Sequence, residues 1–306
     1  MKTIICILLL LATVLSCFGC SPDAPIGTSE LVDDRGETVR IAKDTKVAAL
    51  HASFAECWLL AGGELVGVTS DAKEDRDLPL GDAEVVGTAK SVNAEALVAT
   101  GAEVVFLSLD LVAHADLEAL LSPLGIECAY FRIDTFFDYS SVMKRFTEIT
   151  GRYDLYERSV TAVGTRIDEI KANAPSGTAP TVLLLRVYST GIKAKSDDNI
   201  AGIILKDLGA CNVIDTHPSS LEEISLEYIA AADPEYIFIL TMGDESSALG
   251  YLEANFESNR VWQELDAYIN GRIHILPKDL YHYKPCERWA ESYEYIAKIL
   301  YPEIFG

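Results

Sequence analysis

Several polar and aromatic side chains stand directly after short apolar runs, where the strands of an α/β protein end and its ligand-holding loops begin. Arg186 follows the run 181–185, and Lys284 stands in the stretch 281–285, which is rich in Tyr and His. A guanidinium and an ammonium group in such loops could pair with the carboxylates of an anionic ligand. Tyr and His rings beside them could stack on a flat ligand or ligate its metal. The candidate ligand residues are therefore His51, Ser53, Asp110, Arg186, Tyr188, Tyr283 and Lys284.

The histidines do not indicate a metal centre built by protein side chains alone. The chain has 5 His, with no His-x-His pair and no pair four residues apart. A receptor for a free metal ion would need His51, His114 and Asp110 to converge within bonding distance of one ion. His217, in a loop, and His274, inside an apolar run, are interpreted as structural histidines.

The N-terminus is typical of an export signal. Lys2 is followed by an apolar stretch, residues 4–12, and then by small residues before a cysteine. A membrane-spanning helix needs about 20 apolar residues, and no other part of the sequence is apolar over such a length. The sequence around Cys20 resembles the end of a bacterial lipoprotein signal, in which the cysteine is lipidated and becomes the first mature residue. Cys20 is the expected lipidation site; the alternatives are Cys17 or an ordinary cleaved signal.

Composition restricts the partners. Lys and Arg total 25 and Asp and Glu total 47, for a formal net charge of −22. Such acidity argues against a nucleic-acid partner and against binding to anionic lipid through the folded surface. We expect an extracytoplasmic protein that contacts the membrane through its lipid anchor alone. Export permits disulfides, but unpaired thiols are the favoured interpretation for the cysteines after Cys20, which have no CxxC or zinc-type spacing: Cys57, Cys128, Cys211 and Cys286.

Apolar runs and amphipathic stretches alternate along the rest of the chain, a pattern that predicts an α/β fold. A turn signal within 31–41 predicts a hairpin. The expected strands are 46–50, 65–69, 103–107, 129–133, 181–185, 236–240 and 272–276. The expected helices include 116–124, 138–150, 155–172, 200–208 and 287–301.

The 306 residues suggest about two domains. We expect two lobes, each a small, mostly parallel sheet flanked by helices, bridged by one long helix. A ligand would then lie in the crevice between the lobes, at the carboxyl ends of the strands. The predicted segments are a signal peptide (1–19), a tether (20–30), an N-terminal lobe (31–150), a linking helix (151–176) and a C-terminal lobe (177–306).

The two predicted lobes share a small motif. Asn93 and Ser225 each stand where a helix is expected to begin, and each is followed two residues later by a glutamate, Glu95 or Glu227. A glutamate at this position interacts favourably with the positive end of the helix dipole. Equivalent acids on two lobes also suit a docking surface with two contact points.

Together these features resemble the substrate-binding proteins of bacterial ABC importers for iron–siderophore complexes, haem and vitamin B12. The resemblance runs from about Leu31 to the C-terminus, although 101–103 departs from the family, which more often has Pro-Asp there. The motifs that carry it are Asp34-Arg35-Gly36-Glu37-Thr38-Val39, Asn93-Ala94-Glu95, Ser225-Leu226-Glu227, Ala232-Asp233-Pro234, and Val261-Trp262 leading to Asn270-Gly271-Arg272-Ile273.

The resemblance implies two α/β lobes, a rigid linking helix, and a metal chelate bound as cargo rather than as a cofactor. It implies an importer permease with its ATPase as partner, with Glu95 and Glu227 meeting arginines on the permease. A cationic or neutral chelate is easier for so acidic a chain to hold, while an anionic one such as haem would need Arg186 and Lys284 in the cleft, facing its carboxylates. The alternatives are a receptor for free Zn²⁺ or Mn²⁺ and an extracytoplasmic enzyme on the same scaffold. No GxSxG, Walker or HExxH motif is present, so we expect no enzyme and assign no catalytic residue.

Overall fold

The computed structural model describes residues 28–175, 177, 179–216 and 224–306. The predicted signal peptide, the lipidation candidates Cys20 and Cys17, and His217 lie outside the described residues. The first strand, β1 (Thr28–Val32), includes the last residues of the predicted tether 20–30. Among the described residues, no helix combines the length and the apolar character needed to cross a bilayer.

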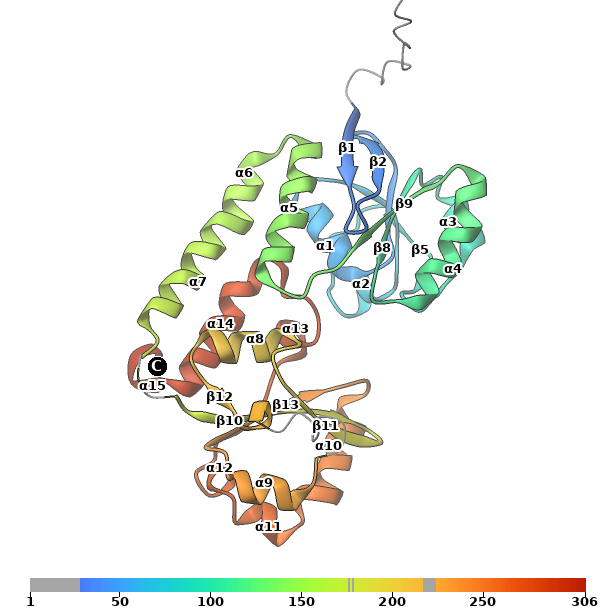
Figure 1. The fold of residues 1–306 in the computed structure, drawn as a ribbon. Helices are drawn as coiled ribbons and strands as arrows, with labels where there is room; N and C mark the ends of the chain where they lie inside the picture. The colour runs from blue at the N-terminus through green and yellow to red at the C-terminus, as the bar shows by residue number, and fades with distance from the viewer. Residues whose placement is uncertain (1–27, 176, 178, 217–223) are drawn as a thin grey trace, which may run out of the picture.

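The N-terminal lobe is built on a parallel sheet with the strand order β5-β4-β3-β8-β9 (Figure 1). Buried strands of a parallel sheet are apolar along their whole length, and β3 and β8 are buried at every position. The strands are β3 (Val47–Ala49), β4 (Leu65–Val68), β5 (Glu84–Val85), β8 (Val104–Ser108) and β9 (Glu127–Phe131). The helices are α1 (Ala52–Leu60), α2 (Asp71–Glu74), α3 (Ala94–Ala99), α4 (Val112–Leu121) and α5 (Phe136–Thr150).

Two hairpins complete this lobe. β1 pairs antiparallel with β2 (Thr38–Ala42), as the turn signal predicted. Gly36 in the connecting turn has a φ of +86°, a conformation that suits glycine. The second hairpin is short and pairs β6 (Gly87–Thr88) with β7 (Ser91–Val92).

The C-terminal lobe has a sheet with the order β11-β10-β13-β14, in which β12 also pairs with β10. β11 is antiparallel to β10 and the other pairings are parallel, so the predicted α/β architecture with mostly parallel sheets is confirmed. The strands are β10 (Thr181–Tyr188), β11 (Gly191–Lys195), β12 (Cys211–Asn212), β13 (Tyr236–Thr241) and β14 (Ile273–Ile275). The helices are α8 (Ile200–Asp207), α9 (Leu226–Ala232), α10 (Glu245–Leu252), α11 (Arg260–Gln263), α12 (Asp266–Ile269), α13 (Lys278–Tyr281), α14 (Trp289–Leu300) and α15 (Pro302–Phe305).

The connection between the lobes is helical but is not a single regular α-helix. α6 (Tyr153–Tyr156) continues through a π-helical turn at Glu157–Thr161 into α7 (Ala162–Asn173). Ile167 and Ile170 of α7 are buried, and α7 lies along α14 (Figure 1). Ile167 and Ile170 belong to one apolar cluster that extends from α1 and α5 to β10, α8 and α14. The lobes therefore share part of their core.

Candidate functional site

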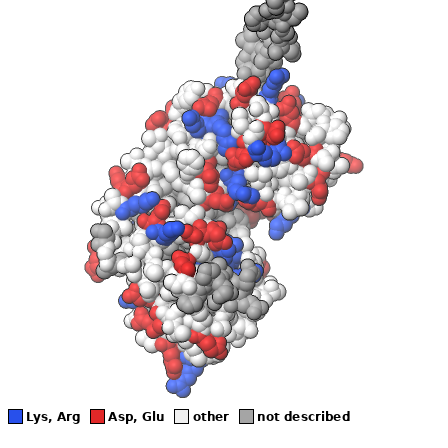
Figure 2. All heavy atoms as spheres, in the orientation of Figure 1, with Lys and Arg blue, Asp and Glu red and all other residues white. Residues whose placement is uncertain are grey.

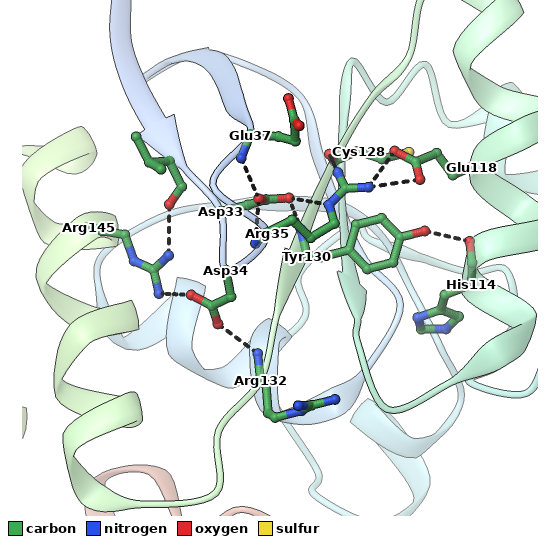
Figure 3. Close-up of polar contacts among 11 residues, drawn as sticks. Asp33, Asp34, Arg35, Glu37, His114, Glu118, Cys128, Tyr130, Arg132 and Arg145 are labelled. Carbon is green, nitrogen blue, oxygen red and sulfur yellow. Dashed lines mark hydrogen bonds and ion pairs between the residues drawn. The ribbon is translucent and has the colours of Figure 1, made fainter.

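The acidic and basic residues within 33–37, in the turn of the first hairpin, join that hairpin to the N-terminal sheet (Figure 3). The buried Asp33 carboxylate accepts hydrogen bonds from the backbone N–H groups of Arg35 (2.8 Å), Glu37 (3.0 Å) and Tyr130 (3.0 Å). Arg35 Nε also donates to it at 2.8 Å. Burial alone would raise the pKa of Asp33, but these donors outweigh it, and the pKa lies below the ordinary value. Asp33 is therefore held as a carboxylate.

Arg35 extends this network across the lobe. Its guanidinium lies 4.0 Å from the centre of the Tyr130 ring and pairs with Glu118 at 2.9 Å. The Tyr130 hydroxyl donates to the backbone carbonyl of His114 at 2.8 Å (Figure 3). Contacts of this kind fix β9 against α4, so the loops at the carboxyl end of the sheet stand on a rigid base.

His114 has a structural role. Its ring is buried, and its Nδ1 accepts a hydrogen bond from the Ser108 N–H at 2.8 Å. Its Nε2, 2.9 Å from the Ala89 carbonyl oxygen, then carries the proton and donates. Both ring nitrogens are thus engaged, and none is free to meet His51 and Asp110 at a metal ion. In the part of the chain that the structure describes, no three His, Cys, Asp or Glu side chains are grouped to hold a metal. The receptor for a free metal ion is therefore not favoured.

A row of acidic and basic side chains, alternating in sign, runs from the N-terminal lobe to the segment before α14. Asp110 pairs with Arg132 Nε at 2.8 Å, and Arg132 lies 4.0 Å from Asp134. Asp134 in turn pairs with Lys284 at 2.9 Å. Asp34 fixes the backbone at Arg132, because its carboxylate accepts the Arg132 N–H at 2.8 Å. The structure thus places the predicted ligand residues Asp110 and Lys284 in one ion-pair row, with their charges already balanced.

Neither Arg132 nor Asp134 was selected from the sequence. Arg132 lies inside the expected strand 129–133, whereas β9 ends at Phe131. The strand-end criterion used for 181–185 would have found only Asp134. The exposed side chains of Arg132 and Asp134 pair in solvent, where an ion pair contributes little to stability. A ligand could therefore displace these contacts at small cost.

Arg76 is a buried contact between the lobes that the sequence analysis also missed. It forms an ion pair with Glu56 on α1 and donates to the backbone carbonyl of Lys284. Its Nη2 also donates to the hydroxyl of Ser53 at 3.2 Å, and its guanidinium lies 5.7 Å from the Tyr283 ring centre. These Arg76 contacts form a clamp between the lobes. Ser53 is 1% exposed, so its hydroxyl is part of this clamp. Its role in ligand binding stays a prediction.

His51 is the N-cap of α1. Its Nδ1 accepts a hydrogen bond from the Ser53 N–H at 3.3 Å. Burial lowers the pKa of His51 to about 4, so the ring is neutral near pH 7 and carries its proton on Nε2. A neutral imidazole in this tautomer offers a ligand a hydrogen-bond donor rather than a lone pair. Metal ligation through Nε2 would require the proton to move to Nδ1 and the cap to break.

Arg186 differs from the other candidate cations. It stands on β10, where alternate residues share a face of the sheet, and Val182 and Leu184 on its face belong to the cluster shared by the lobes. Its Nε is buried without a hydrogen-bond partner. Within the described ranges, Arg186 forms no ion pair. Burial, and then the nearby charges of Lys278 and Arg186, lower the pKa of His282, which places the guanidinium near the segment before α14.

The two aromatic candidates lie on different segments. Tyr188 ends β10 and lines a pocket of about 810 Å³ together with Tyr251 and Phe256. Tyr283 is half-buried, and burial followed by the charge of Asp75 raises the pKa of its phenol. A raised pKa keeps the phenol protonated near pH 7, so it favours stacking and hydrogen bonding over metal ligation.

Glu95 and Glu227 are exposed in the first turns of α3 and α9. The predicted caps are confirmed: Asn93 accepts from the backbone N–H at position 96 at 3.1 Å, and Ser225 from that of Tyr228 at 3.2 Å. On the face shown in Figure 2, Asp and Glu are interspersed with Lys and Arg over both lobes, so the excess acidity is spread rather than concentrated.

A model of the family described as periplasmic binding protein matches residues 47–280. The chain belongs to this family. Its members are extracytoplasmic binding proteins, which agrees with the expected location and with the absence of catalytic motifs from the sequence. None of the curated proteins matches the chain.

Solved structures share the fold at low sequence identity. An ABC transporter substrate-binding protein from Listeria monocytogenes EGD-e is 21% identical, with a TM-score of 0.71 over 85% of this chain and 100% of that chain. A periplasmic haem-binding protein from Pseudomonas aeruginosa is 22% identical, with a TM-score of 0.67 over 85% and 94%. Staphylococcus aureus SirA, complexed with staphyloferrin B, is 18% identical, with a TM-score of 0.67 over 90% and 98%.

Proposed function

We propose that the chain captures an anionic metal chelate between its lobes and delivers it to the permease of an ABC importer. The observation that carries this proposal is the Arg186 guanidinium, which has a buried Nε without a partner and no ion pair among the described residues. An unpaired buried donor is costly, and an anionic ligand would satisfy it. A ferric siderophore with carboxylate groups and haem with its propionates both have the required charge.

The neighbouring groups support the same class of ligand. Lys284 already pairs with Asp134, whose side chain is about half exposed, and a ligand carboxylate could replace that partner. His51 offers an N–H donor from the opposite lobe. Three donors on two lobes suit a ligand rich in oxygen acceptors, while a neutral or cationic chelate would leave Arg186 unpaired. Structures with the same fold include a haem-binding protein and a complex with staphyloferrin B.

Delivery would use the two exposed glutamates and the N-terminal lipid. We assign Glu95 and Glu227 to docking on arginines of the permease, one contact per lobe, and Cys20 to lipidation. Charges at the rim of an interface mainly steer and orient the partners. In this scheme the protein has no cofactor of its own, because the chelate is cargo.

Titration of the purified protein with a panel of ligands tests the proposal. The panel contains a ferric carboxylate siderophore, a ferric hydroxamate siderophore of neutral charge, haem, a corrinoid, Zn²⁺ and Mn²⁺. Tryptophan fluorescence and visible absorption follow binding. We expect a Kd of about 1 μM or tighter for the ferric carboxylate siderophore or haem, without turnover. Tight binding of Zn²⁺ or Mn²⁺ alone, with no chelate bound, would refute the function.

The docking assignment has a separate test. The double variant Glu95→Ala with Glu227→Ala should keep the affinity for the chelate and abolish its uptake into cells that carry the importer. A matched control replaces two exposed glutamates elsewhere, Glu84 and Glu303, by alanine. Because the control loses the same charge, its uptake should stay near that of the unaltered protein. Loss of chelate binding in the first double variant would contradict the assignment.

A further inference from the structure

Two cysteines far apart in the sequence meet at the junction of the lobes. Cys57 lies on α1 of the N-terminal lobe, and Cys286 begins the 3₁₀ turn that leads into α14. Their Sγ atoms are 3.9 Å apart, and both residues are 0% exposed. The other described cysteines lie elsewhere: Cys128 on β9 and the exposed Cys211 on β12.

The surroundings bring Cys286 to this position. Its backbone has a φ of +52°, in the left-handed region that side chains with a Cβ rarely adopt. Its Sγ lies 3.8 Å from the Ser53 carbonyl oxygen on α1 and 3.8 Å from Arg76 Nη1. The clamp between Arg76 and the backbone of Lys284 holds the same segment. The two thiols thus face each other across a contact that the rest of the junction maintains.

We propose that Cys57 and Cys286 form a disulfide in the exported protein. A disulfide has an S–S distance of about 2.05 Å, so the bond requires the sulfurs to approach by about 2 Å. The oxidant would be a disulfide of an extracytoplasmic thiol oxidoreductase or of a small molecule. One thiolate attacks that disulfide and displaces a thiolate from it. The second protein thiolate then attacks the mixed disulfide, so the oxidant leaves as two thiols and the protein retains the S–S bond.

Because both sulfurs are buried, the disulfide would have to form before folding is complete. An oxidant cannot reach them in the folded protein, so exchange takes place during folding after export, before α1 closes over the segment preceding α14. The resulting bond would join the N-terminal lobe to α14 at the edge where Arg76 already connects them. Opening of the crevice at this edge would then be restricted.

Peptide mapping by mass spectrometry tests the bond without any ligand, so its outcome is independent of the proposed function. The full chain is exported with its own signal, then denatured in excess iodoacetamide without reductant. We expect Cys128 and Cys211 to be alkylated, and the peptides of Cys57 and Cys286 to be linked until a reductant is added. Alkylation of all four cysteines, both in exported protein and after refolding with oxidised glutathione, would overturn the proposal.

Thermal unfolding provides a second measurement. The bond would close a loop of more than 200 residues, which restricts the unfolded chain. Exported protein that is unfolded and refolded in the presence of reductant should therefore have a Tm lower by about 5 °C or more than exported protein unfolded and refolded without it. The Cys57→Ser variant should start at the lower Tm and not respond to reductant, whereas the control Cys211→Ser, at an exposed site, should respond as the unaltered protein does. An equal Tm after refolding with and without reductant in the unaltered protein would count against the bond.

Discussion

The two lobes follow one plan but differ where they face each other. In the N-terminal lobe, the three-residue strand β3 leads through His51 directly into α1. In the C-terminal lobe, β10 has eight residues and turns back as the antiparallel β11 before Asn199 caps α8. The hairpin carries Arg186 and Tyr188 beyond the point at which the N-terminal strand has already ended.

Most arginines of both lobes form ion pairs. Arg35, Arg76, Arg132 and Arg145 do so in the N-terminal lobe, and Arg260, Arg272 and Arg288 do so in the C-terminal lobe. Arg186, in the longer strand of the C-terminal lobe, forms none among the described residues, and its Nε is buried without a partner. We infer that Arg186 supplies the charge that selects the ligand, whereas Arg132 of the N-terminal lobe is already balanced. Substitutions in each lobe should therefore have different consequences.

The largest expected effect is on the stability of the N-terminal lobe. Asp33→Ala leaves three backbone N–H groups and the Arg35 Nε without their acceptor, and breaking such a buried network costs about 3–5 kcal/mol of unfolding free energy. Urea unfolding measures the loss. The matched control is Asp244→Ala in the C-terminal lobe, where an exposed carboxylate caps α10 and its removal should cost much less unfolding free energy. Equal losses would remove the contrast between the lobes.

The same carboxylate should make stability depend on pH. The pKa of Asp33 is lower in the folded protein than its ordinary value of 3.8. Its stabilising contribution is therefore complete above the unfolded pKa and is lost as the pH falls through the lower folded pKa. The Asp33→Ala variant should lose less stability than the unaltered protein when the pH is lowered below about 4.

The next effect is on ligand affinity and belongs to the C-terminal lobe. Arg186→Ala removes a charged donor without a competing partner, so the Kd for the bound chelate should rise about 10- to 100-fold. Arg132→Ala, in the N-terminal lobe, removes a cation that Asp110 already balances, and the Kd should change less than about threefold. Isothermal titration measures both. A larger loss in Arg132→Ala would place the selective charge in the N-terminal lobe instead.

The sequence allowed the regular elements to be predicted, because buried parallel strands such as β8 and β13 are continuous apolar runs. It did not predict the full extent of β10, because the charged Arg186 follows the apolar run 181–185 and the strand was expected to end before it. Arg76 was missed for a similar reason. It stands in a stretch of charged residues, 73–77, that has the composition of a solvated surface. Only the contact with α1 and the backbone of Lys284, 208 positions away, shows that it is buried.

In the candidate site, too, features set by local sequence could be predicted, and features set by contacts between distant segments could not. Helix starts at Asn93 and Ser225 follow from local sequence, because an N-cap bonds to backbone only three residues ahead. The row from Asp110 to Lys284 joins loops distant in sequence, and its pairing is decided by how the lobes pack. Residue type alone therefore indicated which side chains could meet a ligand, but not which of their charges were already balanced.

The smallest expected effect comes from making the helix caps of the two lobes alike. His51 caps α1 and Asn199 caps α8, and each accepts a backbone N–H of its own first turn. Asn is at least as good an N-cap as His, so His51→Asn should change the unfolding free energy at pH 7.5 by less than about 0.5 kcal/mol. Because the folded pKa of His51 is about 4 and its unfolded pKa is near 6.5, the unfolded state binds the extra proton between these values, and stability falls as the pH drops from 6.5 toward 4. His51→Asn should reduce that fall, measured by urea unfolding at pH 7.5 and 5. The reciprocal variant Asn199→His, at a site 9% exposed, should create a similar fall in the C-terminal lobe. If His51→Asn kept the full acid sensitivity, another group would be responsible and the two caps would be equivalent.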